Sequence, residues 1–273
     1  MSDIVLTAGV RANLLQLQST AATITNTQSK LATGKRVNSA LDNPINFFTA
    51  QGLSNRAGDL GNLLDSMSSG VNTIQAANNG ITSITKLVQS SQALASQAMQ
   101  TSDVTVRAGL AAQFDSIRAQ IDQLAADASF NGINLLNSTV STDLTVQLNE
   151  KNTSSVTVAA VDSTSTGLAI NNATNNWAAA ADITAASGEL TAALTTLRSQ
   201  SQAFGSQLST VQIRQDFTKA MVNTLQSGSD ALTLADSNEE GANLLALQTR
   251  QQLSTTALSL ASQASQAVLR LFQ

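Results

Sequence analysis

The side chains that could carry chemistry lie mainly in two short polar segments. Lys30, Lys35 and Arg36 lie near one end of the chain, and Asp236-Ser237 and Glu239-Glu240 lie near the other. Neighbouring acidic groups can bind a metal ion or exchange protons, but either task needs further groups that converge on them, and the adjacent sequence offers none. Two interpretations remain open. The basic and acidic segments form ion pairs with each other, or each is solvated and a pair contributes at most about 1 kcal/mol.

The composition removes most catalytic chemistry. The chain has no histidine, cysteine or tyrosine, a single tryptophan and a single proline. It therefore lacks the usual general base at neutral pH, the thiol nucleophile and the soft metal ligands. The glycine-rich run over residues 52–61 is no phosphate-binding loop, because no strand precedes it and no Lys-Ser/Thr pair follows it. We expect a protein that is not an enzyme and that uses no cofactor or metal.

Charge and hydropathy limit the kinds of partner that the chain is expected to bind. The chain has 14 basic and 18 acidic residues and a net charge of −4, which argues against nucleic-acid binding. No apolar run is long enough to cross a membrane, so we expect no membrane insertion. The opening residues mix Asp3, Thr7 and Gly9 with short apolar side chains and do not resemble a cleavable signal peptide. If the protein leaves the cell, we expect a route that keeps the N-terminus.

Apolar residues recur every three or four positions at both ends of the chain. Near the start the stripe comprises Val10, Leu14, Leu17, Ala21, Ile24, Gln28 and Leu31, and near the finish it comprises Leu253, Ala257, Leu260, Ala264, Ala267 and Leu271. A stripe that repeats about every 3.5 residues is typical of a seam between helices, and each of these stripes is too narrow to form a core by itself. The two ends are therefore predicted to be helices that need partners; the first runs from about Ile4 to Leu31.

Between the ends, the sequence predicts three more helices and a small β region. Asn43-Pro44 is typical of a helix start, with Asn as the cap and Pro in the first turn. The next helix is expected to close at Asn131-Gly132, which resembles a C-terminal cap. Alternating apolar residues over 144–148 and 156–160 predict a hairpin with a polar turn, and residues 162–176 predict a surface loop.

The longest predicted helix, over residues 190–232, must lie against the two helices before the hairpin, because its apolar seam needs cover. The residues expected to pack these helices together are Phe114, Ile117, Ile121, Leu124, Phe204, Leu208 and Val211. Trp177 is interpreted as a packing anchor in preference to a contact for an external partner. The predicted fold class is mainly α. It is a long, coiled-coil-like helical bundle formed by the N- and C-terminal segments, with a small β-hairpin and loop region in the middle of the chain.

Several motifs, taken in order, resemble bacterial flagellin. They are residues 31–43 (LATGKRVNSALDN), 78–80 (NNG), 130–133 (FNGI), and the C-terminal run from QTRQQL at 248–253 to VLRLF at 268–272. The resemblance covers nearly the whole chain except about residues 139–182, where flagellins vary most. It is specific because it involves the order and spacing of motifs at both ends together.

The resemblance implies a structural subunit that polymerises into the extracellular flagellar filament used for swimming. It implies an inner core made of residues 1–33 and 241–273, connecting spokes at 34–43 and 235–240, a helical shell at 44–138 and 183–234, and a hairpin with a variable surface loop at 139–182. The residues expected in the inner-core interface are Val10, Leu14, Leu17, Ile24, Leu31, Leu253, Leu260, Ala264, Val268 and Leu271. The expected connector residues are Gly34, Lys35, Arg36, Asn38, Asp42, Asn43, Glu239 and Glu240.

The partners that the resemblance implies are further copies of the same chain, the flagellar export apparatus, a cytoplasmic export chaperone, and the filament cap and junction proteins. Two alternatives stay open. A hook-associated junction protein would share the terminal pattern while joining two different assemblies. A flagellin-like surface binding module would need an outward aromatic or charged site, and the region 139–182 offers only Trp177 and few charges.

Overall fold

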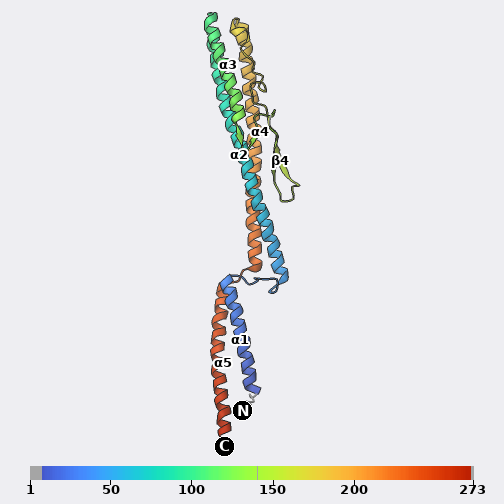
Figure 1. Ribbon diagram of the computed structural model, residues 1–273, viewed down its shortest axis with the longest axis vertical. Coiled ribbons are helices and arrows are strands. Elements are labelled where there is room, and N and C mark those ends of the chain that lie inside the picture. The colour runs from blue at the N-terminus through green and yellow to red at the C-terminus, as the bar shows by residue number, and fades with distance from the viewer. Residues whose placement is uncertain (1–7, 140, 272–273) are drawn as a thin grey trace. The chain divides into compact units, whose positions relative to one another are not determined.

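The computed structural model describes residues 8–139 and 141–271, and five helices account for most of them (Figure 1). The helices are α1 (Ala8–Thr33), α2 (Pro44–Gln100), α3 (Val104–Asp127), α4 (Ala180–Thr233) and α5 (Ser237–Leu271). Between α3 and α4 lie the strands β1 (Ser129–Phe130), β2 (Ile133–Asn134), β3 (Leu144–Gln147) and β4 (Ser155–Val158), and the short 3-10 helix η1 (Thr174–Trp177). The predicted fold class is confirmed. The predicted start of the first helix near Ile4 lies outside the described residues.

The chain divides into two compact units. One comprises Met1–Asn55 and Thr224–Gln273, and the other comprises Arg56–Asn223. Both α2 and α4 contribute residues to each unit. The first unit therefore contains both terminal helices and the connectors, and the second contains the central helices and all four strands.

Side-chain caps begin three of the helices where the sequence provides Asn or Asp. The amide of Asn46 donates to Asn43 Oδ1 at 3.0 Å, which confirms the predicted start of α2 at Pro44. Asp103 Oδ1 accepts from the amide of Thr105 at 2.8 Å at the start of α3. Asp236 Oδ1 accepts from the amide of Asn238 at 2.8 Å at the start of α5. These acceptors satisfy amides that a helix leaves unpaired in its first turn. The α5 helix therefore begins at Ser237, earlier than predicted and inside residues 235–240, which were expected to form a connector.

The end of α3 differs from the prediction. The helix stops at Asp127, and Asn131-Gly132 forms the turn of the β1–β2 hairpin instead of a helix cap. Both turn residues have positive φ, 51° at Asn131 and 81° at Gly132, as a two-residue hairpin turn requires. Asn134 then closes the helix, because its Nδ2 donates to the carbonyls of Ala125 and Ala126 at 2.8 and 2.9 Å.

The core of the second unit lies between α2, α3 and α4, which run side by side (Figure 1). Of the predicted packing residues, Phe114, Ile121, Phe204 and Val211 are buried, whereas Ile117, Leu124 and Leu208 are partly buried. One polar contact crosses this core, from Ser201 Oγ on α4 to Asn78 Oδ1 on α2 at 2.8 Å. The α4 helix begins at Ala180, earlier than predicted, because the alanine-rich residues before Leu190 also form helix and bury Ile183 and Ala186.

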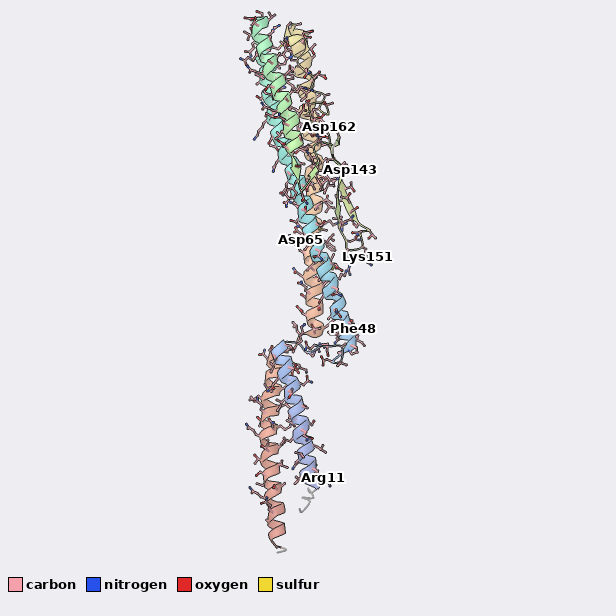
Figure 2. The ribbon with its side chains drawn as sticks, in the orientation of Figure 1. Arg11, Phe48, Asp65, Asp143, Lys151 and Asp162 are labelled. Carbon is pink, nitrogen blue, oxygen red and sulfur yellow. The ribbon has the colours of Figure 1, made fainter. Side chains whose placement is uncertain are left out.

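The predicted hairpin is confirmed as β3 paired antiparallel with β4, with Leu144 opposite Val158. Its inward residues pack on α2 at a glycine. A Cβ on Gly70 would lie 2.6 Å from Val146 Cγ2, so only glycine lets the strand approach this closely. Lys151 lies in the turn of the hairpin, and Asp143 lies just before β3 (Figure 2).

The segment over residues 162–177, of which residues 162–176 were expected to form a surface loop, is held against α3. Arg118 Nε donates to the Ile170 carbonyl at 2.8 Å, Asp122 Oδ1 accepts from the Ser165 amide at 2.7 Å, and Asp115 Oδ1 accepts from the Ala173 amide at 2.9 Å. Leu168, Ile170 and Trp177 are buried. The Trp177 ring centroid lies 5.0 Å from that of Phe114, so the interpretation of Trp177 as a packing anchor is confirmed.

Candidate assembly interface

The terminal helices α1 and α5 pack along each other within the first unit (Figure 1). On α1 the seam contains Val10, Thr20, Ile24 and Thr27, which are buried, and Leu17 and Leu31, which are partly buried. On α5 the partly buried residues recur every three or four positions: Leu244, Leu247, Gln251, Ser254, Leu258 and Ala261. The spacing is that of a coiled-coil seam. Its Thr, Gln and Ser members make it less apolar than a typical core.

Beside this seam, α5 carries a second apolar stripe that nothing covers within the described chain. Leu253 and Leu260 are 66% and 67% exposed, and Ala257 and Ala264 are exposed as well. At about 100° per residue, this stripe is centred about 120° around α5 from the seam with α1, so it flanks the seam. On α1, Leu15 is likewise 67% exposed.

The predicted interface residues therefore separate into two groups. Val10 and Ile24 are buried between α1 and α5, with Leu17 and Leu31 partly buried beside them. Leu14, Leu253, Leu260 and Ala264 are exposed. The side chains of Val268 and Leu271 lie outside those that the structure describes. The sequence analysis missed the inner stripe of α5, because Gln251 and Ser254 interrupt its apolar pattern.

The connectors pair as a short antiparallel bridge between Lys35 and Leu234. The amides of Arg36 and Val37 donate to the Thr233 carbonyl at 2.7 and 3.1 Å, and the amide of Ala235 donates to the Gly34 carbonyl at 3.0 Å. Gly34 has a φ of 67°, a conformation that suits glycine after the last turn of a helix. Backbone hydrogen bonds thus link the connector after α1 to the end of α4 and to the connector that precedes α5.

One ion pair joins the predicted basic and acidic segments. Lys30 Nζ lies 2.9 Å from Glu240 Oε1, and the two side chains are 30% and 13% exposed. The ion-pair interpretation is therefore confirmed for Lys30 and Glu240. Arg36 instead donates from Nη2 to the Leu232 carbonyl at 3.3 Å. The amide of Glu239 donates to Asp236 Oδ1 at 3.3 Å, so Glu239 belongs to the capped start of α5.

Asp42 organises the connector before α2. Its Oδ2 accepts from the amides of Asn38 and Ser39 at 3.0 and 2.9 Å, and from Ser39 Oγ at 3.2 Å. The amide of Ser39 and then that of Asn38 favour the carboxylate and lower the pKa of Asp42 below its ordinary value. Asp42 and Asn43 therefore act as turn and cap residues, which is a structural role.

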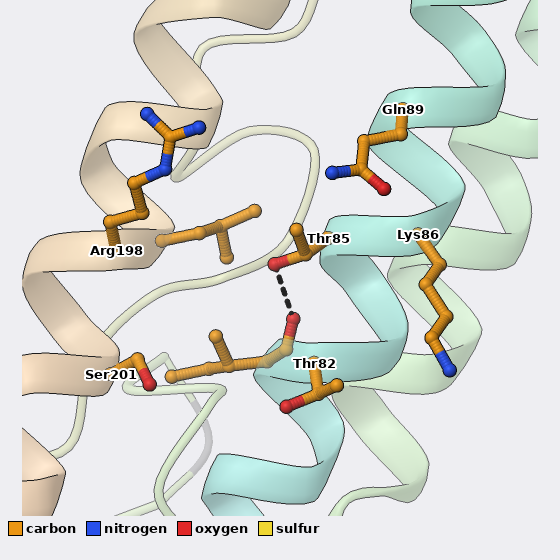
Figure 3. Close-up of a pocket in the computed structure, with 8 residues that line it drawn as sticks. Thr82, Thr85, Lys86, Gln89, Arg198 and Ser201 are labelled. Atoms are coloured by element: carbon orange, nitrogen blue, oxygen red, sulfur yellow. Dashed lines mark hydrogen bonds between the residues drawn. The ribbon is translucent and has the colours of Figure 1, made fainter.

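A groove in the second unit is the alternative candidate site. It lies between α2 and α4, has a volume of about 290 Å³, and is lined by Thr82, Thr85, Lys86, Gln89, Arg198 and Ser201 with two aliphatic side chains (Figure 3). Thr85 Oγ1 donates to the Ile81 carbonyl at 2.7 Å, so this hydroxyl is engaged by its own helix. The lining is basic and neutral, and it offers no acid and base pair of the kind that catalysis uses.

Within residues 8–139 and 141–271, no cluster of three or more His, Cys, Asp or Glu side chains could hold a metal ion. Among the helices of those same residues, none combines the length and apolarity needed to span a membrane. The feature that most distinguishes the described surface is therefore the uncovered apolar stripe of α5.

Comparison with known proteins shows which family the chain resembles. Family models of the bacterial flagellin N-terminal and C-terminal helical regions match residues 7–141 and 169–272. The chain is similar to flagellin FljM of Caulobacter vibrioides, with 33% identity over 274 residues that cover 100% of this chain and 99% of the relative. It is also similar to a flagellin of Brucella melitensis, with 26% identity over 283 residues that cover 100% of both chains.

Among solved structures, the crystal structure of Bacillus cereus flagellin matches 55% of this chain and 86% of that chain, with 21% identity and a TM-score of 0.49. The two family models together span both terminal helices and most of the central ones. FljM is also a flagellin, and its similarity covers the whole of this chain, so it agrees with the two family models. The chain therefore belongs to the bacterial flagellin family, whose members are the structural subunits of the flagellar filament outside the cell.

Proposed function

We propose that this chain polymerises into the filament by burying the uncovered apolar stripe of α5, together with the exposed leucines of α1, against neighbouring copies. The observation that carries the proposal is that α5 has two apolar faces. Leu244 and Leu247 lie toward α1, whereas Leu253 and Leu260 remain 66% and 67% exposed. Fully burying one leucine contributes about 2 kcal/mol, so a stripe of several per copy is a large driving force in a polymer.

The same arrangement explains why a single copy leaves the stripe uncovered. The seam between α1 and α5 includes Thr20, Thr27, Gln251 and Ser254, which contribute less on burial than leucine does. A second helix layer supplied by other copies would cover the remaining leucines. Because the stripe of one copy would meet a different surface of the next, the contact is heterologous and extends into an open helical array.

The test is filament growth from sheared filament seeds, followed by electron microscopy. Leu260→Asp places a charge in the proposed interface, so we expect no growth, since burying an unpaired carboxylate costs several kcal/mol. Ser259→Asp adds the same charge at the neighbouring exposed position on the polar side of α5, and we expect filaments from it. Circular dichroism should show both variants equally helical as monomers.

Normal filaments from Leu260→Asp would contradict the proposal. Growth that stops at short capped stubs with the unmodified chain would instead favour the junction-protein alternative. A third variant that lacks residues 1–33 tests whether α5 can drive assembly without α1. We expect it to form no filaments, because both the α1–α5 seam and the exposed leucines of α1 are lost.

Before assembly, the same stripe needs cover in the cytoplasm. We extend the proposal to a cytoplasmic chaperone that binds α5, to passage through the flagellar export apparatus without cleavage of the N-terminus, and to folding beneath a filament cap, with junction proteins at the filament base. The exposed Leu253 and Leu260 support the chaperone step, because an uncovered apolar helix face promotes aggregation.

A further inference from the structure

Two further sets of exposed apolar side chains lie away from the terminal helices. Leu41, Ile45 and Phe48 are 96%, 78% and 62% exposed, and we name them the Phe48 patch. Ile213 and Phe217 on α4 are 67% and 56% exposed, and we name them the Phe217 patch. Single exposed apolar residues are ordinary on a protein surface, whereas several large ones together mark an interaction site.

The spacing within each set places its members together. Phe48 lies in the first turns of α2 (Figure 2), and Ile45 precedes it by three residues. Leu41 lies in the turn just before that helix. Ile213 and Phe217 are four residues apart and share one face of α4. A third set of exposed residues does not qualify, because Val104 and Val106 are two residues apart and project from different sides of α3.

The charges beside the two patches are complementary. Asp42 lies next to Leu41 at the Phe48 patch, and its carboxylate is exposed and hydrogen-bonded to backbone amides that favour its ionised form. Arg214 follows Ile213 at the Phe217 patch and is exposed, with no carboxylate of the described residues within ion-pair distance. Asp216, which precedes Phe217, is exposed as well, but it lies 3.6 Å from Lys219, so the net charge beside this patch is positive. An apolar centre with opposite charges at its edges is the arrangement of a specific protein interface.

We propose that the Phe48 patch of one copy docks on the Phe217 patch of a neighbouring copy. The inference rests on the proposed function, because it takes the neighbour from the filament, and it adds a contact that the terminal helices do not make. Two different patches meet, so a docked pair of copies still offers one unused patch of each kind. Such a heterologous contact propagates along an array, whereas a patch that met itself would close a two-fold dimer.

The natural chain has no cysteine, so introduced thiols report this contact without background. The test variant carries Phe48→Cys and Phe217→Cys in one chain. Filaments are grown from it under reducing conditions, treated with a short thiol-specific cross-linker, and dissolved for gel electrophoresis. We expect a ladder of dimers, trimers and longer species, because each copy links to two different neighbours.

Three controls make the outcome specific. Phe48→Cys alone and Phe217→Cys alone should give no cross-linked species. The pair Phe48→Cys with Gln212→Cys should give at least tenfold less ladder, because Gln212 is exposed on α4 but projects about 100° around the helix from Ile213. Equal ladders from the Gln212 pair, or dimers from a single-cysteine chain, would overturn the proposal.

A second arrangement covers the case in which the double variant does not polymerise. The two single-cysteine chains are mixed, each as a small fraction, with a large excess of the unmodified chain, which then forms the filament. Cross-linked dimers containing one chain of each kind support the contact. Intact filaments without such dimers refute it while leaving the proposed function standing, and failure of the unmodified chain to form filaments refutes the proposed function itself.

Discussion

Leu136 packs directly on Gly80. A Cβ added at Gly80 would lie 2.5 Å from Leu136 Cδ1 and 2.9 Å from the Cβ of Ala128. Leu136 is fully buried, so its side chain has little room to withdraw. The glycine thus lets the segment that follows β2 lie against α2, although glycine costs helix stability relative to alanine.

Gly80→Ala tests this close approach. The substitution gains up to about 1 kcal/mol of helix propensity, but the clash forces Leu136 or the helix to move. Overpacking of this kind costs about 1–3 kcal/mol, so we expect a net loss in the free energy of unfolding measured by urea denaturation. Gly58→Ala is the matched control on the same helix, because a Cβ there meets nothing within 4 Å. The control should raise stability by about 0.5–1 kcal/mol, and equal effects of the two variants would show that Gly80 is not tightly packed.

Trp177 should report on the packing of its own segment. It is the only tryptophan, and it is fully buried against Phe114. We expect a blue-shifted fluorescence maximum in the native protein that moves red on unfolding. Trp177→Ala removes a large buried ring and should lower the free energy of unfolding by about 3–5 kcal/mol, measured by circular dichroism. A native emission maximum typical of solvated indole would contradict the burial.

The ion pair between Lys30 and Glu240 should stabilise the pairing of α1 with α5. Because Glu240 is only 13% exposed, we expect Glu240→Gln to lower stability by about 1 kcal/mol at low salt. The reversed pair, Lys30→Glu with Glu240→Lys, should recover part of the loss. Asp216→Asn is the control, because its contact with Lys219 is 3.6 Å long and both side chains are exposed, and it should change stability by less than about 0.5 kcal/mol. Similar losses from both substitutions would refute a special role for the partly buried pair of Lys30 and Glu240.

The connector before α2 should lose order in acid. The amides of Ser39 and Asn38 hold the pKa of Asp42 below its ordinary value of 3.8. A lowered pKa in the folded state means that the contribution of Asp42 is present above the unfolded value and is lost as the pH falls through the folded pKa. We expect the amide resonances of Asn38 and Ser39 to shift in NMR spectra with a midpoint below 3.8. The shift should vanish in Asp42→Asn, and a midpoint at or above the ordinary value would rule out these hydrogen bonds.

The start of α2 could be predicted because single residues specify it. Asn43 is a local signal that acts on the amide of Asn46, three residues later. The hairpin β3–β4 could also be predicted from the sequence, since two short alternating runs with a polar turn between them are typical of paired strands. Local chemistry determines these features, so no distant contact is needed to foresee them.

Other features depend on contacts between distant residues, and the sequence analysis missed them. Asn131-Gly132 suits both a helix end and a hairpin turn, and the contact of Asn134 with the α3 carbonyls decides between them. The leucines of α5 lie on two sides of one helix, and only the position of α1 determines which side is covered. The segment 162–177 has no periodicity, because three charged residues of α3, and not a repeating pattern, hold it in place.

Asn175, Asn176 and Trp177 adopt left-handed backbone conformations in succession, with φ of 50°, 50° and 59°. A residue other than glycine in this conformation costs about 1–3 kcal/mol and persists only because its surroundings hold it there. The buried indole supplies that restraint, so loosening Trp177 would also release the strain in the two residues before it. The segment should then open as one cooperative unit. In a hydrogen-exchange experiment, the bonded amides of Ser165, Ile170 and Ala173 would share a single opening free energy, although they bond to three different acceptors.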